Sequence, residues 1–354
     1  MQMRANLRNG LARKAVRRTA IFLAGVLLSL TLLELGARVL SNVLGMSPYM
    51  TYDAQLGWIA KLNSIKEHRD RNKQFDVTYE INESGFRGPK YPLARDDNLY
   101  RIVVLGDSTG FGWGVDLANT FATILDRELD DTEVINLSLS GYGIDQSYLR
   151  FVREGIGYKP DLVILQVSHN DFEEIMHPFF NQKPKPHFLK SAAGAPTLTN
   201  VPAKPLGKRA EYFYDNSLPV PFKEWLGWHS YTFNLMNEIY YGLRHRSSTN
   251  ATSLDSIYST ASIDLFNSIV GLLQARLDEI GAKGLLVFST KEISENGYIV
   301  QDHLKVLDLY PAFLDAGIGD PSKYYFSDGY HWNIAGHHLV AEELKRAIGT
   351  LRSN

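Results

Sequence analysis

The sequence alternates between apolar segments typical of buried strands and segments whose apolar residues recur at helical spacing. The strand-like segments are 100–107, 132–140, 159–171 and 284–290. The helix-like segments are 119–129, 144–156, 262–284 and 332–351, the last with Asn333 as its expected N-cap. Strands that alternate with helices indicate a parallel sheet covered on both faces. We therefore predict an α/β fold.

The N-terminal 40 residues have a different character. Residues 1–18 contain six Arg and Lys residues and no acid, and residues 20–33 contain no charge. Glu34 and Arg38 then follow at a spacing that lets them pair on a helix. A cleavable signal peptide also fits this pattern, but no small-x-small cleavage site follows the apolar run. We favour an uncleaved transmembrane signal anchor over 20–40, with residues 1–19 as a basic cytoplasmic segment.

The rest of the chain divides into three parts. Residues 41–99 are expected to be an irregular lead-in, and residues 100–354 the α/β domain. Residues 172–257 interrupt the alternation and are rich in Pro and aromatic residues, so we interpret them as an insertion over the sheet. The chain has no cysteine, which excludes disulfides and thiolate chemistry. Because the only basic run lies at residues 1–18 and the body is mildly acidic, nucleic-acid binding is not expected.

A glycine-rich turn, Gly-Asp-Ser-Thr-Gly, follows the first strand at 106–110. A dinucleotide fingerprint that starts at Gly110 fails because position 115 is Val, and a P-loop fails because the turn has no Lys. A serine in such a turn is often only a cap or a turn residue. However, Ser108 lies at the carboxyl end of a strand, where open α/β sheets bind ligands, so it is also a candidate nucleophile.

Four further residues support the nucleophile interpretation. Gly141 follows the second strand and Asn170 ends the third, and a backbone N–H and an Asn amide are donors that an oxyanion hole requires. Asp328 precedes His331 by three residues, so that Asp328 can orient the ring of His331 as a general base. No set of His, Asp and Glu residues has convincing metal spacing, and no cofactor is expected.

These residues resemble the sequence blocks of the SGNH, or GDSL-type, hydrolases. "GDST" is similar to the first block, "LSGYG" to the second, "SHND" to the third and "DGYHWN" to the last, although Ser168 stands where the third block usually has glycine. The first block also fits the nucleophile elbow of the α/β-hydrolases, but Asp-x-x-His near the C-terminus favours the SGNH family. The resemblance implies a three-layer α/β/α sandwich with a parallel five-stranded sheet. It implies Ser108 as nucleophile, His331 as base and Asp328 as its partner, with the Ser108 N–H, Gly141 and Asn170 as oxyanion donors.

The anchor, the lead-in and the insertion resemble the membrane-anchored bacterial branch of that family. We therefore expect a single-pass protein of the bacterial inner membrane with a periplasmic domain. The expected activity is ester hydrolysis or acyl transfer through an acyl-serine, on an O-acetylated glycan outside the cytoplasm. A membrane-bound O-acyltransferase is a candidate partner. A lipid-directed or small-ester esterase and a catalytically idle scaffold subunit remain as alternatives.

Overall fold

The computed structural model describes residues 2–43, 49–70, 72–180, 183–190, 194–203, 226, 229–233, 235–236, 257–299, 304–317 and 320–353. The chain forms two compact units. One consists of Met1–Ser47 and Trp225–Thr249, and the other of Pro48–Glu224 and Asn250–Asn354. The sequence-predicted lead-in and α/β domain therefore lie mostly in one compact unit.

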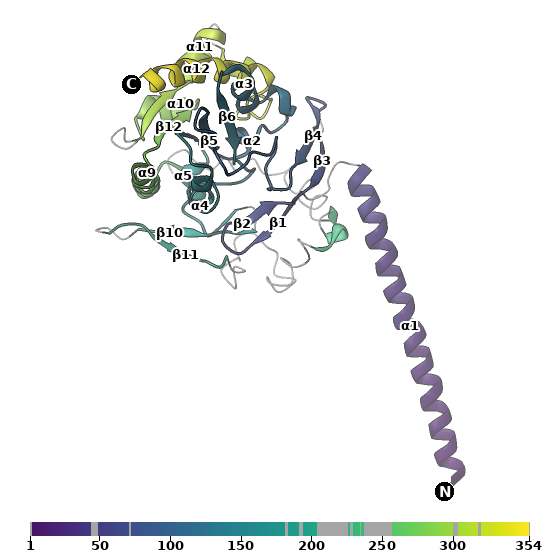
Figure 1. Cartoon of the computed structure of the whole chain (residues 1–354). Coiled ribbons are helices and arrows are strands. Elements are labelled where there is room, and N and C mark those ends of the chain that lie inside the picture. Colours follow the sequence, from purple (N-terminus) through teal and green to yellow (C-terminus); the bar gives the residue numbers. More distant parts are fainter. Residues whose placement is uncertain are drawn as a thin grey trace. The chain divides into compact units, whose positions relative to one another are not determined.

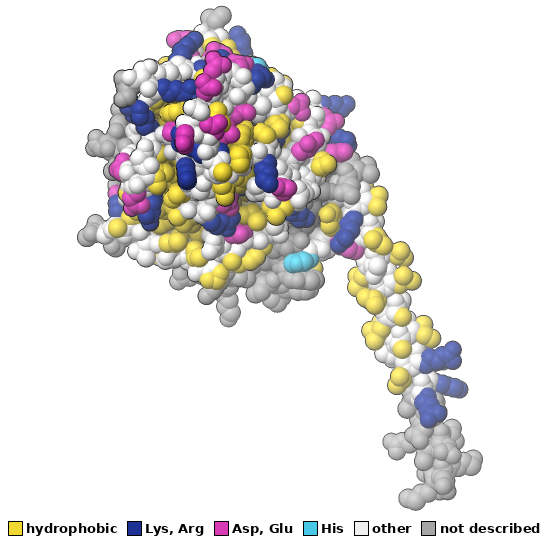
Figure 2. Space-filling model, in the orientation of Figure 1, with side chains coloured by type: hydrophobic (Ala, Val, Ile, Leu, Met, Phe, Trp, Pro, Cys, Tyr) yellow, Lys and Arg dark blue, Asp and Glu magenta, His cyan; other side chains and the backbone are white. Residues whose placement is uncertain are grey.

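The first unit is built on the long helix α1, Gln2–Val43. Its stretch Arg13–Ser41 is long and apolar enough to cross a membrane, a test that a signal sequence also passes. Figure 2 shows hydrophobic side chains along this helix and Lys and Arg side chains toward its N-terminal end. Glu34 accepts hydrogen bonds from the Ser230 hydroxyl at 2.9 Å and from the Tyr231 N–H at 2.8 Å, and Arg38 lies 3.5 Å from it. These contacts reduce the cost of a carboxylate within an apolar helix.

In the second unit, the described residues form a five-stranded sheet in the order β13-β12-β7-β5-β6. Its strands are β5 (Tyr100–Leu105), β6 (Thr132–Asn136), β7 (Leu162–Gln166), β12 (Lys283–Phe288) and β13 (Lys305–Asp308). Every neighbouring pair is parallel. The sequence pattern predicts four of these strands, with longer bounds, but not β13. The parallel α/β fold is confirmed.

Helices cover both faces of this sheet (Figure 1). On one face lie α3 (Phe121–Glu128), α11 (Tyr310–Gly317) and α12 (Ile334–Ser353), and on the other lie α4 (Ile144–Arg153) and α9 (Thr260–Ile280). Residues of β5 alternate between the two cores: Ile102 and Val104 pack in the first, Val103 and Leu105 in the second. This alternation is what a strand buried on both faces requires. The predicted three-layer α/β/α arrangement is thus present.

The lead-in is more regular than predicted. It contains two antiparallel hairpins, β1 (Met50–Asp53) with β2 (Gly57–Ala60) and β3 (Ser64–Arg69) with β4 (Asp76–Ile81). The alternating burial of β4, with inward Val77, Tyr79 and Ile81, explains why it forms a strand. The Tyr79 hydroxyl accepts the N–H of Gly114 at 2.8 Å, so this hairpin contacts the glycine-rich turn.

The predicted insertion begins and ends inside the core. Phe172 stacks on Phe266 with ring centroids 4.2 Å apart, and Ile257 is buried in the same cluster. Between these ends lie short elements: α5 (Asp171–Glu174), β8 (Phe179–Phe180), β9 (Lys183–Pro184), β10 (His187–Leu189) and β11 (Thr197–Thr199). Most of 204–256 lies outside the described residues. The remaining short helices are α2 (Ser108–Phe111), η1 (Leu117–Asn119), η2 (Gly155–Tyr158), α10 (Lys291–Asn296) and η5 (Pro321–Tyr324).

Candidate active site

Ser108 is the first residue of the one-turn helix α2, directly beyond the carboxyl end of β5. The Asp107 side chain caps this helix by accepting the Thr109 N–H at 2.7 Å. Gly112 ends the helix in the left-handed conformation at φ +83°. The chain therefore turns sharply on both sides of Ser108, and the serine side chain remains half-exposed at the edge of the sheet.

The glycines of this turn make room for protein side chains. A Cβ on Gly106 would lie 2.6 Å from Gln166 Oε1, and one on Gly110 would lie 2.6 Å from the Ser138 hydroxyl. Gln166 Oε1 accepts the Gly110 N–H at 3.0 Å. The close approach fixes the turn against β7 and the segment that follows β6, so the glycines serve the position of Ser108 rather than the binding of a phosphate.

Arg87, from the lead-in, holds the other side of the turn. Its buried guanidinium donates to the carbonyls of Phe111 at 3.1 Å, Gly112 at 2.8 Å and Val115 at 2.6 Å. Burial lowers the pKa of Arg87 to about 10, which still leaves it charged near neutral pH. This residue could not be predicted from the sequence, because its hydrogen-bond partners are backbone carbonyls, which leave no side-chain pattern.

The loop before α12 brings His331 to Ser108. The His331 Nε2 lies 2.7 Å from the Ser108 hydroxyl oxygen, and its Nδ1 lies 2.7 Å from Asp328 Oδ2. Asp328 Oδ1 accepts the N–H groups of Tyr330 and His331, both at 3.1 Å. Sequence positions 108, 328 and 331 are therefore joined in one hydrogen-bonded chain, as the sequence analysis expected.

Hydrogen bonds hold the Asp328 carboxyl in its charged form. Burial alone would raise the pKa of Asp328, but the hydrogen bonds from the His331 ring and from the Tyr330 N–H outweigh it and lower the pKa. A charged Asp328 beside Nδ1 keeps the ring proton on Nδ1 and leaves Nε2 as an acceptor toward Ser108. This is the arrangement that a general base needs.

Aromatic rings enclose the His331 ring. Trp113 stacks on it with centroids 4.1 Å apart and an interplanar angle of 15°, and the Tyr330 ring lies at 4.1 Å and 38°. His68 contacts the edge of Trp113 at 5.2 Å, and burial, followed by the charge of Lys66, lowers the pKa of His68 to about 4. His68 is thus uncharged near neutral pH and serves as part of the wall. His331 itself is only 4% exposed.

Gly141 lies in the turn after β6, at φ +81°. A Cβ there would lie 2.7 Å from Phe180 Cε1 and 3.4 Å from Trp58 Cζ2, and these two rings stack with centroids 6.2 Å apart. No acceptor among the described residues takes the Gly141 N–H. The group is therefore available as a donor, beside an aromatic pair.

Asn170 lies just beyond β7, at the start of α5. Its Nδ2 donates to Glu174 Oε1 at 2.5 Å, so one of its two amide hydrogens is engaged. Ser168, in the position where the resembling family usually has glycine, is buried and accepts from Gln166 Nε2 at 2.9 Å. Its N–H donates to Asp171 Oδ2 at 2.7 Å. The loop after β7 is thus fixed by its own side chains.

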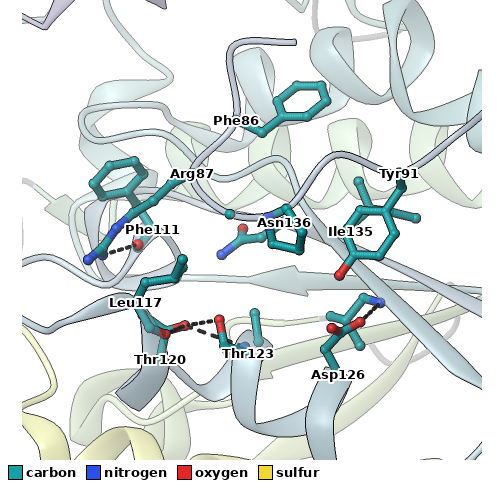
Figure 3. A pocket seen from close by; sticks show the side chains of 14 residues that line it. Phe86, Arg87, Tyr91, Phe111, Leu117, Thr120, Thr123, Asp126, Ile135 and Asn136 are labelled. Atoms are coloured by element: carbon teal, nitrogen blue, oxygen red, sulfur yellow. Dashed lines mark hydrogen bonds between the residues drawn. The ribbon is translucent and has the colours of Figure 1, made fainter. Parts of the chain in front are cut away.

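Figure 3 shows a small cavity away from this cluster, with a volume of about 50 Å³. It lies among the lead-in, α3 and β6, and is lined by residues that include Arg87, Tyr91, Thr120 and Asn136. Neither Ser108 nor His331 lines it. Within the part of the chain that the structure describes, no group of His, Asp and Glu residues could hold a metal ion.

Residues 104–204 match the sequence model of the GDSL-like Lipase/Acylhydrolase family. The match covers Ser108, Gly141 and Asn170 and ends before Asp328 and His331. No curated protein sequence matches the chain.

The chain is similar to several solved structures of esterases and lipases. The acetyl xylan esterase AlAXEase is 15% identical over 70% of this chain and 99% of its own, with a TM-score of 0.37. The psychrotrophic esterase EstA from Pseudoalteromonas sp. is 15% identical over 73% of this chain and 100% of its own, with a TM-score of 0.40. A GDSL-like lipase from Bacteroides thetaiotaomicron VPI-5482 is 13% identical over 74% of this chain and 93% of its own, also with a TM-score of 0.40. Likeness at this level identifies no substrate.

Proposed function

We propose that this protein is a serine esterase or acyltransferase that works through an acyl-serine intermediate. The observation that carries the proposal is the chain of two 2.7 Å contacts from Ser108 through His331 to Asp328. A serine hydroxyl is a weak nucleophile unless an oriented base removes its proton, and this geometry supplies that base. The family match at 104–204 supports the same reaction class.

In the proposed reaction, the Ser108 oxygen attacks the ester carbonyl carbon while its proton moves to His331 Nε2. The Ser108 and Gly141 N–H groups and the Asn170 amide hold the oxyanion. The bond to the leaving alcohol then breaks, and His331 returns the proton to that alcohol. Water or a sugar hydroxyl next attacks the acyl-serine and gives its proton to His331, which returns it to Ser108.

The test is covalent labelling by a fluorophosphonate probe together with turnover of p-nitrophenyl acetate. We expect labelling at Ser108, and loss of both labelling and turnover in Ser108→Ala and His331→Ala, because nucleophile and base act as a unit. Each variant should remain folded by circular dichroism. Turnover near that of the unmodified protein in Ser108→Ala would refute the proposal, and an unlabelled, inactive protein would favour the scaffold alternative.

We further propose that the substrate is an O-acetylated glycan on the outer side of a bacterial inner membrane. The aromatic pair of Trp58 and Phe180 against Gly141 supports a small acyl group, because it limits the space beside a proposed oxyanion donor. The apolar helix with its basic N-terminal end supports membrane attachment with residues 1–19 inside. A membrane-bound O-acyltransferase is the proposed partner, since its chemistry would supply acetyl groups to the same glycan.

Two measurements separate these finer proposals from their alternatives. Release or transfer of acetate on an acetylated polysaccharide should exceed activity on long-chain lipid esters, and the reverse order would favour a lipid-directed esterase. Protease added to spheroplasts should digest the body of the chain and leave a short anchored fragment. Protection of the whole chain would refute the topology, and release of a soluble mature form would favour a cleaved signal peptide.

A further inference from the structure

Glu174 is a buried carboxyl that the reaction above does not use. It lies four residues after Asn170, on the one-turn helix α5, and is 8% exposed. Its Oε1 accepts one hydrogen of the Asn170 amide at 2.5 Å. Glu174 thus contacts the side chain that is proposed to stabilise the oxyanion.

The other side-chain oxygen of each residue in this pair needs a hydrogen-bond donor. Both Asn170 Oδ1 and Glu174 Oε2 are buried, and neither has a hydrogen-bond partner among the described residues. An amide oxygen and a carboxylate oxygen are both acceptors, so they cannot satisfy each other. A proton on Glu174 Oε2 turns that oxygen into a donor and can satisfy both atoms with one hydrogen bond.

The groups around Glu174 favour that proton. The negative charges of Asp107 and Asp145 disfavour a charged Glu174, Asp171 interacts with it in the same sense, and the ammonium of Lys185 acts in the opposite direction. Lys185 is itself paired with Asp145, both fully buried, so that it neutralises one acid of this set. Tyr330, which packs on His331, also interacts electrostatically with Glu174. Because burial raises the pKa of Tyr330 to about 12, its hydroxyl is neutral near neutral pH.

We propose that Glu174 is a positioning residue for Asn170 and acts in its protonated form. The protonated carboxyl accepts one amide hydrogen on Oε1 and donates from Oε2 to Asn170 Oδ1, so that two hydrogen bonds fix the amide plane. The second hydrogen on Asn170 Nδ2 then points away from Glu174 and is free for the oxyanion. The inference rests on the proposed role of Asn170 in the reaction above.

The proposed pair of hydrogen bonds depends on pH, because it requires the proton on Glu174. The pKa of Glu174 is raised to about 8, first because burial disfavours the charged form; Asp107 and Asp145 act in the same direction, while the Asn170 amide and Lys185 oppose them. Above that pH the carboxylate presents two acceptor oxygens to the amide. The second hydrogen bond is lost, and a negative charge stands close to the developing oxyanion. We therefore expect kcat to fall as pH rises through this range.

The experiment compares three variants across about pH 6 to about pH 10, with p-nitrophenyl acetate as substrate and the Ser108→Ala protein as the blank. Glu174→Gln keeps an acceptor and a donor in the same places but does not titrate. It should keep kcat within about threefold of the unmodified protein near neutral pH and lose the fall above pH 8. Glu174→Leu removes both hydrogen bonds and should lower kcat about 10²-fold with little change in KM. Glu173→Gln, on the same helix, is the matched control and should keep the original pH profile.

Persistence of the alkaline fall in Glu174→Gln would overturn the proposal, whether or not Glu174→Leu folds. A kcat in Glu174→Leu equal to that of the unmodified protein would overturn it as well. Fluorophosphonate labelling separates this failure from failure of the proposed function. If Ser108 is labelled and Glu174→Gln still shows the fall, only the role of Glu174 is wrong; if Ser108 is not labelled, the proposed reaction is wrong.

Discussion

Replacement of Asp328 by Asn tests the site without changing the number of heavy atoms in the hydrogen-bonded turn. In the native site, Oδ1 accepts two backbone N–H groups and Oδ2 faces His331 Nδ1 at 2.7 Å. An Asn can keep Oδ1 as the acceptor of both N–H groups. Its NH₂ group then takes the place of Oδ2 and faces Nδ1 as a donor. To keep a hydrogen bond with this donor, His331 Nδ1 must act as an acceptor, and the ring proton then moves to Nε2.

The size of the effect follows from this tautomer. With the proton on Nε2, His331 faces Ser108 as a donor and cannot remove the hydroxyl proton, although every heavy atom stays in place. The same exchange in other Ser-His-Asp sites lowers kcat by about 10⁴, which corresponds to about 5.4 kcal/mol of barrier. We expect a loss of that order in kcat for p-nitrophenyl acetate and only a small change in melting temperature.

Asp320→Asn is the matched control. Asp320 forms a similar turn, in which Oδ1 accepts the Ser322 N–H at 3.0 Å, but it forms no hydrogen bond with a histidine among the described residues. The Asp320→Asn substitution should leave kcat unchanged. A kcat in Asp328→Asn within tenfold of the unmodified protein, with the fold intact, would refute the assignment of Asp328 as the partner of the base.

Three further outcomes are expected. Asn170→Ala should lower kcat by about 10²–10³ with little change in KM, as steady-state kinetics would show, because one oxyanion donor is lost. Gly141→Ala should lower the melting temperature and kcat together, since an alanine at φ +81° costs roughly 1–2 kcal/mol and its Cβ would meet Phe180. Because the pKa of Glu174 is raised on folding, its contribution to stability is full below pH 4.5 and declines as pH rises to about 8. Glu174→Gln should therefore gain stability over the unmodified protein as pH rises, by up to about 1.4 kcal/mol per pH unit in denaturant titrations.

The sequence was informative where strands end. Apolar runs marked β5, β6, β7 and β12, and each run that carries chemistry stops at a polar residue or a glycine. Parallel strands bring their carboxyl ends to one edge, so residues distant in sequence could be expected together. The spacing of Asp328 and His331 then indicated a local pair, and the structure places that pair on Ser108.

The supporting residues could not be found in this way. The hydrogen bonds of Arg87 go to backbone carbonyls, and its guanidinium also lies over the Tyr79 ring at 4.4 Å, a contact between residues that no sequence motif links. β13 has four residues and no fully buried side chain, so it lacks an apolar run. Glu174 did leave a signal, since it follows Asn170 by four residues, the spacing of facing side chains on a helix. That signal was hidden by the expectation that an insertion over the sheet begins at residue 172.

Burial raises the pKa of both Asp328 and Glu174, but their net pKa shifts are opposite, and the difference lies in their hydrogen bonds. Asp328 accepts three N–H groups, so its pKa is lowered despite the cost of burial. Glu174 accepts one and lies close to further acids, so its pKa is raised to about 8. Environments that shift the pKa values of two carboxyl groups in opposite directions assign one group to a charged role and the other to a neutral role. The proposed reaction needs Asp328 charged beside the base and Glu174 neutral beside the oxyanion donor. Its kcat should therefore have an alkaline limb that Glu174→Gln removes, whereas Asp328→Asn should lower kcat without moving that limb.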